Sequence, residues 1–294
     1  MTVPGDVRAR AADATTSAAS PSPSSTGPHQ IADTGFGGVL RSEWTKLRTV
    51  RSTTWSLAAT VLLSIAIGML ATGTAASHWS HRSLIDRLTF DPTSRSLTGL
   101  LFGQLAVGVL GVLTMSAEYG TGTIRATLAA VPRRWRVLAA KAIVFFVLVV
   151  VVGELVSFVA FFVGQVMLGS GPPHATLGQP GVLRAVVSGG LYLAILGLLA
   201  LGVATIVRHT AGAISAFVGV LFVLPLIAQA LPTAIQHAVS RYLPAFIGAA
   251  TTSTRPGVRA AFDAFPAWEG LAILGGYAVA ALVIGAWVLE RRDA

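Results

Sequence analysis

Six long apolar stretches constrain the fold of this chain more than any other feature of its sequence. Each is close to the ~20 residues that a helix needs to cross the hydrocarbon of a bilayer. Because backbone polar groups in lipid must be satisfied within the segment, we expect each stretch to be helical. The sequence therefore predicts an all-α polytopic membrane protein with six transmembrane helices. We place these helices at 53–73, 97–117, 142–168, 184–207, 211–231 and 268–289.

The composition excludes an ordinary soluble protein. Hydrophobic residues make up 53% of the 294 and charged residues only 11%, whereas roughly a quarter of a soluble chain is charged. The net charge of +9 comes from basic residues that flank the apolar stretches, so the lipid bilayer explains it better than nucleic acid. No cysteine is present, which excludes disulfides, thiolate metal sites and cysteine nucleophiles.

The N-terminal part of the sequence divides into a polar tail and a short basic segment. Residues 1–35 are rich in Ala, Ser, Thr and Pro and lack the apolar region of a signal peptide, so we predict a disordered cytoplasmic tail. Residues 37–292 form the predicted six-span transmembrane domain. At its start, the segment 37–51 is expected to be an amphipathic interfacial helix with Leu40, Trp44 and Leu47 on one stripe together with Arg51. The alternative is a polar beginning of the first span.

The distribution of basic residues predicts the topology. With both termini inside, fourteen of the 21 lysines and arginines fall in cytoplasmic segments and seven outside. This bias favours a multi-pass protein of the plasma membrane with both termini cytoplasmic. In the last outside segment, 232–267, a helical stripe continues past Pro244. It predicts a helix on or dipping into the outer leaflet, with a plain loop as the alternative. The stripe consists of Ile235, Val239, Tyr242 and Phe246.

The segment between the second and third spans has its own local chemistry. It reads EYGTGTIRATLAAVPRRWRVLAAK over 118–141 and holds five basic residues against one acid. Gly120 and Gly122 are expected to break the preceding helix, and Thr121 or Thr123 to cap a new one. Apolar residues at i, i+4 and i+7 follow, and a proline ends the pattern. We therefore predict a short amphipathic helix beneath the membrane, with an ordinary basic loop as the alternative.

These features together resemble the membrane subunits of type-2 ATP-binding-cassette (ABC) transporters. The resemblance is to the bacterial form, in which permease and ATPase are separate chains. It covers roughly 39–292, and its most specific part is SAEYGTGTIRATLAAVPRR at 116–134. It implies a permease subunit of an ATP-driven exporter, not an enzyme, working with a cytosolic ABC ATPase subunit and a second permease subunit in a homo- or heterodimer. That ATPase would hydrolyse ATP, so we expect no cofactor bound directly to this chain.

The resemblance also implies roles for two segments. In that family the first cytoplasmic loop carries a coupling helix that docks into a groove of the ATPase. The matching positions here are Glu118, Gly120, Thr121, Gly122, Thr123, Ile124, Arg125 and Leu128. The segment around Trp44, Lys46 and Arg48 corresponds to the connecting helix, which also rests near the ATPase. No motif matches on the surface that would face the substrate.

The chain has no phosphate-binding loop of its own. That loop needs a lysine followed by Ser or Thr after a glycine-rich turn. The two lysines of the sequence are Lys46, followed by Leu47, and Lys141, followed by Ala142. If the protein is driven by ATP, a separate nucleotide-binding chain must therefore dock on it.

Glu154 is an acidic residue near the middle of the third span. A carboxylate at that depth costs free energy, so such residues usually have a partner or a functional role. We consider ion coupling, cargo recognition, or a structural hydrogen bond with Gln104, Gln165 or a serine. Ion coupling would make the chain a secondary transporter with Glu154 as its coupling acid, which is the alternative function.

Three smaller patterns complete the sequence-based predictions. His78 and His81 have a spacing that could bind zinc, but no second pair completes a site, so no metal centre is predicted. Gly99 and Gly103 form a GxxxG motif that permits close helix packing, within one chain or between two. Pro225 is expected to kink the fifth span.

Overall fold

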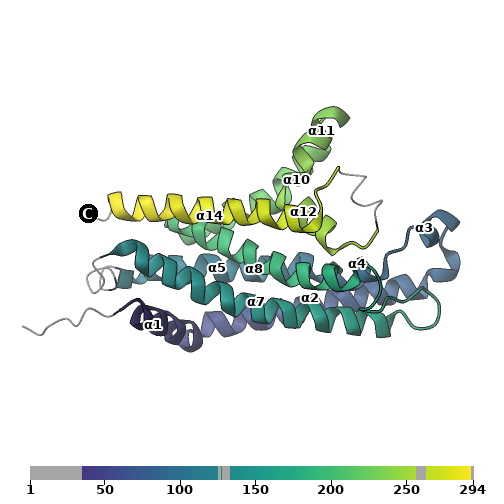
Figure 1. Ribbon diagram of the computed structural model, residues 1–294, viewed down its shortest axis with the longest axis horizontal. Helices are drawn as coiled ribbons and strands as arrows, with labels where there is room; N and C mark the ends of the chain where they lie inside the picture. Colours follow the sequence, from purple (N-terminus) through teal and green to yellow (C-terminus); the bar gives the residue numbers. More distant parts are fainter. Residues whose placement is uncertain (1–34, 125–126, 128–132, 256–262, 293–294) are drawn as a thin grey trace, which may run out of the picture. The chain divides into compact units, whose positions relative to one another are not determined.

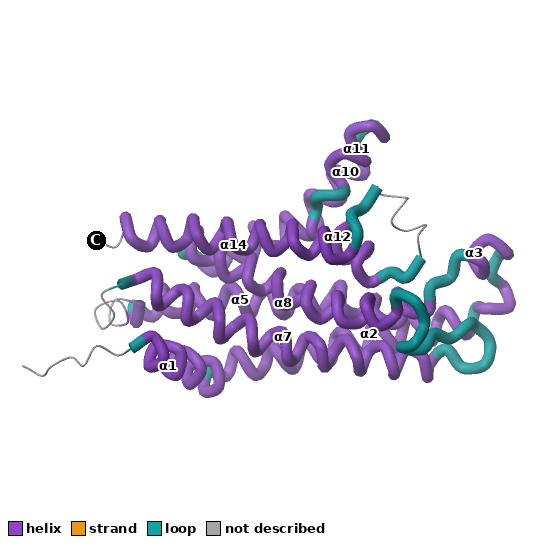
Figure 2. Tube along the Cα trace, viewed as in Figure 1, coloured by secondary structure: helices purple, strands orange, loops and turns teal. Residues whose placement is uncertain are grey.

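The structure is a computed structural model that describes residues 35–124, 127, 133–255 and 263–292. The chain divides into two units, 1–33 and 34–294. The first unit, which holds nearly all of the predicted tail, lies outside the described residues. Every regular element in the described part of the second unit is a helix (Figures 1 and 2).

Six helices of the described part are long and apolar enough to cross a membrane, which confirms the predicted fold class. Most of them extend beyond the apolar stretch, because a helix does not have to end where the hydrocarbon does. The third begins well before the predicted residue 142. The six segments are α2 (Arg51–Ser77), α4 to α5 (Pro92–Ser96, then η2 at Leu97–Gly99, then Leu100–Thr121), α7 (Arg134–Met167), α8 (Val182–Val207), α9 to α10 (Thr210–Gln229) and α14 (Ala267–Arg292).

Helix α8 is the most buried of the six and packs against α5, α7 and α14. Small residues make this possible, because they let neighbouring helices approach closely. A Cβ on Gly197 would lie 2.8 Å from side-chain atoms of Phe145 and Val107. A Cβ on Gly202 would lie 2.7 Å from that of Ala281. The centre of the bundle thus depends on glycines of α8.

The GxxxG pair of the second span packs against α2 of the same chain. A Cβ added at Gly99 would overlap the carbonyl group of Ser64, and one at Gly103 would overlap the Ser64 hydroxyl. No side chain fits at Gly99 unless the helices move apart, because the overlap there is with the backbone. The question that the sequence left open is thereby answered for this pair: the close contact is within one chain.

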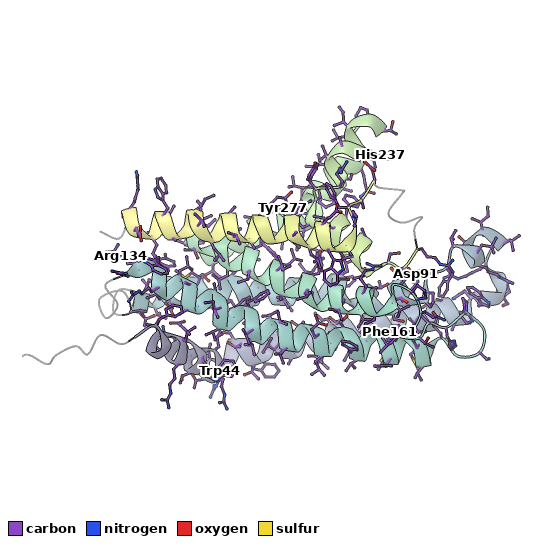
Figure 3. All side chains as sticks on the ribbon, viewed as in Figure 1. Trp44, Asp91, Arg134, Phe161, His237 and Tyr277 are labelled. Atoms are coloured by element: carbon purple, nitrogen blue, oxygen red, sulfur yellow. The ribbon has the colours of Figure 1, made fainter. Side chains whose placement is uncertain are left out.

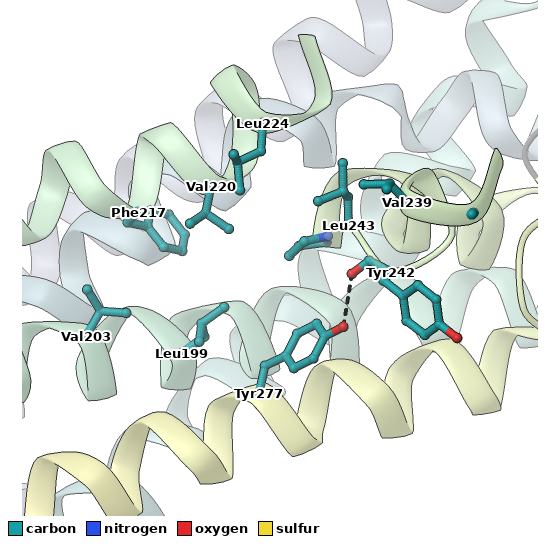
Figure 4. A pocket seen from close by; sticks show the side chains of 11 residues that line it. Leu199, Val203, Phe217, Val220, Leu224, Val239, Tyr242, Leu243 and Tyr277 are labelled. Atoms are coloured by element: carbon teal, nitrogen blue, oxygen red, sulfur yellow. Dashed lines mark hydrogen bonds between the residues drawn. The ribbon is translucent and has the colours of Figure 1, made fainter. Parts of the chain in front are cut away.

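The helix of the fifth span is interrupted by an irregular turn near Pro225, where the sequence predicts a kink. It consists of α9 (Thr210–Val218), a π-helical turn η3 (Gly219–Val223) and α10 (Leu224–Gln229). Proline has no N–H to donate to the preceding turn, which favours such an irregular turn before it. Beside it lies an apolar cavity of 450 Å³ whose walls also come from α8, α11 and α14 (Figure 4).

The segment after the fifth span is helical but not as one continuous stripe. It forms α11 (Thr233–Ser240) and α12 (Pro244–Thr252), because Pro244 begins a new helix. The predicted stripe is divided accordingly. Ile235, on α11, is half exposed, whereas Phe246, on α12, is buried. The single helix predicted over these residues was wrong, since a proline is well suited to a first turn but not to a helix interior.

The N-terminal helix α1 (Phe36–Thr49) packs against α7 with a face that the sequence did not indicate. Its buried residues are Val39, Glu43 and Leu47. Trp44 of the predicted interfacial stripe is 39% exposed, whereas Leu47 of the same stripe is buried and Arg51 belongs to α2. Glu43 lies on the buried face of α1 because its carboxylate has an ion-pair partner inside the protein.

At the end of the bundle remote from α1, a carboxylate and an arginine together join three segments. Asp91 caps α4 through the N–H groups of Thr93 and Ser94 and also accepts hydrogen bonds from Ser253 and Thr254. Arg184 of α8 donates to the carbonyl groups of Thr251 and Ser253. We call this region, with Asp91, Arg184 and Ser253, the α4 end. Figure 3 labels Asp91 and Arg134 at opposite ends of the bundle.

Candidate functional site

Two lysines and two glutamates from three helices meet at the other end of the bundle. The Nζ of Lys141 on α7 lies 2.6 Å from Oε2 of Glu43 on α1 and 2.8 Å from Oε1 of Glu118 on α5. The Nζ of Lys46 lies 2.6 Å from Oε1 of Glu43 and 3.0 Å from Oε1 of Glu118. We call these four residues the α1-end cluster. Each lysine bridges both glutamates, so the cluster joins α1, α5 and α7.

The four side chains of the cluster are exposed to solvent to different degrees. The side chains of Lys141 and Glu43 are each 2% exposed and that of Glu118 is 11% exposed, whereas Lys46 keeps 37% of its side chain in contact with solvent. Burying a charge is costly unless it is paired and hydrogen-bonded. With two positive and two negative groups, every charge in the cluster is paired, and Oε2 of Glu118 is the one carboxylate oxygen of the cluster without a hydrogen-bond partner in the described part of the chain.

Lys46 remains charged at the edge of the cluster. Burial works against its charge, but hydrogen bonds and electrostatic attraction from Glu43 and Glu118 outweigh burial. The pKa of Lys46 therefore lies above its ordinary value. The ammonium group is thus present at physiological pH and binds both carboxylates.

The local sequence explains how Glu118 reaches the cluster. Helix α5 continues through Gly120 and ends at Gly122, whose φ of 71° lies in the left-handed region that glycine adopts without strain. The expectation that Gly120 breaks the helix was wrong, because Gly122 alone takes the conformation that ends it. Glu118 consequently stands one turn before a defined helix end, where α5 faces α1 and α7.

A cavity of 430 Å³ adjoins the cluster. Its wall combines apolar side chains with the four cluster residues, a serine and several threonines. Its lining includes Thr121, the last residue of α5, and Thr123 and Thr127 from the segment that follows. The loop predicted to form a coupling helix therefore begins at the wall of this cavity.

The structure places the predicted coupling residues in three settings. Glu118 is buried in the cluster. Ile124 is also buried, at 7% exposed. Gly120, Thr121, Gly122 and Thr123 are exposed, whereas Arg125 and Leu128 lie outside the described residues. The Thr121 hydroxyl does not cap a new helix but donates to Ala117 of the preceding turn and contacts Thr123.

The three residues assigned to the connecting helix also have different environments. Lys46 belongs to the cluster, whereas Trp44 and Arg48 are exposed on α1. The structure thus brings one residue of this segment, Lys46, together with one residue of the predicted coupling segment, Glu118.

Sequence reasoning missed two members of the cluster, Glu43 and Lys141. One signal could have indicated them. The chain has only two lysines among its 21 basic residues, and both lie in this cluster. A residue type that is so rare, placed twice beside apolar spans, suggests a requirement for the compact charge of an ammonium group.

Two arginines connect the same end of the bundle to α14. Arg208 adopts a positive φ of 61° after α8, donates to the carbonyl of Val288 and lies 5.3 Å from the ring of Tyr119. Arg134, in the first turn of α7, donates to the carbonyl of Leu289. The ends of α5, α7, α8 and α14 are therefore joined close to the cluster.

Glu154 lies apart from the cluster, on the side of α7 that faces α8. An added Cβ at Gly190 would lie 2.6 Å from the Glu154 carboxyl carbon, so the acid packs directly on that glycine. The backbone of Leu191 is nearby, but neither carboxylate oxygen makes a well-formed hydrogen bond within the described part of the chain.

The glutamines considered as partners of Glu154 bond elsewhere. Gln104 accepts a hydrogen bond from the Tyr192 hydroxyl at 2.7 Å. Gln165 donates to the hydroxyl of Ser96 and to a nearby carbonyl group. Of the alternatives considered for Glu154, pairing with either glutamine is therefore excluded, because both side chains have partners on other helices.

Metal-binding side chains do not gather in the described residues: no group of three or more His, Cys, Asp or Glu residues is close enough to hold an ion. The ring of His78 hydrogen-bonds to the carbonyl of Thr74 and to Ser77 instead.

Comparison with known proteins adds one match. Residues 39–237 match the profile of a protein family described as "ABC-2 family transporter protein". This region holds the α1-end cluster, the first five spans and the beginning of α11. A search of curated proteins finds no match.

Proposed function

The chain belongs to the ABC-2 family of transporter proteins, and from this premise we propose that it is the permease subunit of an ATP-driven exporter. Family membership makes it a membrane transport component that works with an ABC ATPase, not the ATPase itself. The proposal adds that a separate chain hydrolyses ATP and that this chain converts the resulting movement into translocation of a substrate. The α1-end cluster is the observation that supports this proposal most directly.

The cluster is suited to transmit force from the loop after α5. Glu118 stands one turn before the end of α5, and its carboxylate binds lysines of α1 and α7. A partner that pushes on the segment 121–124 would therefore displace Glu118, Lys141 and Glu43 together. Because breaking one buried ion pair leaves an uncompensated charge, the three helices are expected to move as a unit.

Helix α7 would carry this movement across the membrane. It is continuous from Arg134 to Met167 and packs against α2 and α8. At 1.5 Å per residue a helix of 34 residues is about 50 Å long, which exceeds the thickness of a bilayer. A tilt of α7 at the cluster would therefore move the other end of this helix, at the opposite membrane surface.

We further propose that two permease subunits, identical or not, form the pathway between them, with both termini of this chain in the cytoplasm. The excess of basic residues in the segments at the α1 end supports that orientation. The coupling helix belongs to the same proposal, with Arg125 and Leu128 facing the ATPase and Trp44 and Arg48 of α1 close to it.

A secondary transporter is the second candidate, because the oxygens of Glu154 have no well-formed hydrogen bond in the described part of the chain. In that case Glu154 would bind and release the coupling ion. Glu154 lines neither the apolar cavity beside the fifth span nor the cavity that adjoins the α1-end cluster, so the ATP-driven function has the stronger support.

The test is co-purification of the tagged chain with ABC ATPases encoded in neighbouring reading frames. The wild-type chain should retain one of them, and Arg125→Glu should abolish retention while leaving the amount of folded permease unchanged. Arg87→Glu is the matched control, because Arg87 is an exposed arginine in the connection between α2 and α4. Retention by Arg125→Glu would refute the proposed docking surface.

Transport by reconstituted vesicles separates the two candidate functions. The proposal predicts that uptake into inside-out vesicles requires ATP and the ATPase chain and survives Glu154→Gln. Uptake that follows a proton gradient without ATP, and that Glu154→Gln abolishes, would establish the secondary transporter instead.

A further inference from the structure

A polar cavity of 360 Å³ lies at the α4 end, between the α2–α4 connection and the beginning of α5. Two of its lining residues, Arg82 and Arg95, carry positive charge. They are close enough for the charge of Arg82 to act on Arg95. Two like charges facing one cavity repel each other, and an anion between them would turn that repulsion into attraction.

Arg82 and Arg95 differ from the other arginines of this region in their hydrogen bonds. Neither guanidinium group has a hydrogen-bond partner in the described part of the chain, and Nε of Arg82 is shielded from solvent. A shielded donor without a partner costs free energy, so a ligand that accepts from it would be stabilising. The neighbouring arginines all donate to backbone carbonyl groups: Arg87, Arg184 and Arg255.

Aromatic packing holds Arg82 at the wall of the cavity. Its Cζ lies 5.5 Å from the ring centroid of Phe90, which is 5% exposed. Phe90 in turn meets Trp79 edge-on at 5.2 Å between centroids. Arg95 is carried by α4, whose first turn is fixed by Asp91. Both cations are therefore pre-positioned, which reduces the entropy lost when a ligand binds.

Two carboxylates also line the cavity and oppose an anion there. Asp91 accepts five hydrogen bonds, so its charge is already well compensated. Asp86 is exposed to solvent and accepts from Ser83. Against these two acids stand four arginines at and beside the cavity, so positive charge remains in excess. They are Arg82, Arg87, Arg95 and Arg255.

We propose that this cavity binds a phosphate group, with the guanidinium groups of Arg82 and Arg95 donating to its oxygens. The planar fork of donors on an arginine matches the geometry of phosphate oxygens. The phosphate has two possible sources, a lipid headgroup and free phosphate. Residues of α3 (Leu84–Leu88) favour the headgroup, because their apolar side chains are 66–73% exposed beside the cavity and would contact acyl chains. They are Leu84, Ile85 and Leu88.

The test measures ligand-induced thermal stabilisation of the detergent-purified full chain. The probes are inorganic phosphate, dihexanoyl phosphatidylglycerol, and a dihexanoylglycerol that has the same acyl chains but no phosphate. We expect a concentration-dependent rise in melting temperature with one or both phosphate probes. Arg82→Gln with Arg95→Gln should weaken binding by about tenfold or more, the loss expected for charge-assisted hydrogen bonds.

Two further variants keep this test decisive. Arg41→Gln is the matched control, because Arg41 is exposed on α1, remote from the cavity, and its binding should equal that of the wild type. If the double variant does not fold, Arg82→Lys replaces it, since it retains the charge and loses the fork. It should bind several-fold more weakly than the wild type.

Each outcome bears on the proposal. Binding of both phosphate probes, or of either alone, supports a phosphate site and identifies its source. The proposal is overturned if neither probe stabilises the wild type, if the lipid without phosphate binds equally well, or if binding is unchanged in the arginine variants.

Discussion

The α1-end cluster and the α4 end are held together by different chemistry. In the cluster, Lys46 and Lys141 bind Glu43 and Glu118, so every partner is a side chain with a full charge, although Arg134 and Arg208 nearby donate to backbone carbonyls of α14. At the α4 end, Asp91 accepts from N–H and hydroxyl groups. Arginines at that end donate to backbone carbonyls.

These two kinds of contact permit different movements of the helices that they join. A hydrogen bond to the backbone fixes the position of a segment, because the partner cannot rotate away. An ion cluster made of flexible side chains fixes only the association of its helices, since lysine and glutamate can follow a tilt while remaining paired. We therefore expect the α4 end to be rigid, whereas α1, α5 and α7 can tilt at the cluster while remaining associated.

The largest expected effect is that of Lys141→Met. It leaves the carboxylates of Glu43 and Glu118 without their most buried counterion, and removing one partner of a buried pair costs about 3–5 kcal/mol. The midpoint of thermal unfolding in detergent should fall strongly, and Arg48→Met, at an exposed position of α1, should leave it unchanged.

The double variant Lys141→Met with Glu43→Gln tests whether the balance of charges determines the stability of the α1-end cluster. Removing one charge of each sign restores the balance, so the double variant should be more stable than Lys141→Met alone. If it is less stable than either single variant, the cluster acts through individual hydrogen bonds, as the α4 end does, and the distinction between the ends fails.

The next largest effect is expected for Asp91→Asn. The amide keeps one acceptor oxygen but turns an NH₂ group toward donors of Ser253 and Thr254, with an expected loss of about 2–3 kcal/mol. Neutralising a cation should not compensate, because the partners of Asp91 are not ionic. Recovery of the melting temperature on adding Arg184→Gln would contradict this account.

A smaller loss is expected at a site without charge, the crossing of α2 and α5. Gly99→Ala would press a methyl group against the backbone of Ser64, and overpacking of this kind costs about 1–3 kcal/mol. Gly73→Ala is the control, because nothing lies within 4 Å of its Cβ position. The melting temperature should fall for Gly99→Ala alone, and an equal fall in both variants would mean that α5 does not approach α2 as closely as described.

Much of this fold could be predicted because it depends on composition over long segments. A span of ~20 apolar residues can satisfy its backbone in lipid only as a helix, and neither tertiary contacts nor partners alter that requirement. The GxxxG motif at Gly99 and Gly103 was equally informative, since the spacing alone places both glycines on one face.

The candidate site could be predicted only in part. The sequence indicated the segment around Glu118, but not that its carboxylate faces inward to Lys141, which is 23 positions away along the chain. Helical periodicity also did not identify the face of α1 that packs against α7, because it cannot recognise that Glu43 has a buried counterion. Partner identity is a tertiary property, and spacing within one helix carries no information about it.

The smallest effect is expected for Lys46→Met, and it tests whether burial or charge count decides the strength of the α1-end cluster. Lys46 makes the same number of ion pairs as Lys141, but 37% of its side chain is exposed. Solvent screens a pair of this kind, so its removal should cost about 1 kcal/mol or less. The shift in melting temperature should therefore be a fraction of that caused by Lys141→Met in the same detergent. Equal shifts would show that the two lysines are equivalent and that the inner lysine has no special role in joining α1, α5 and α7.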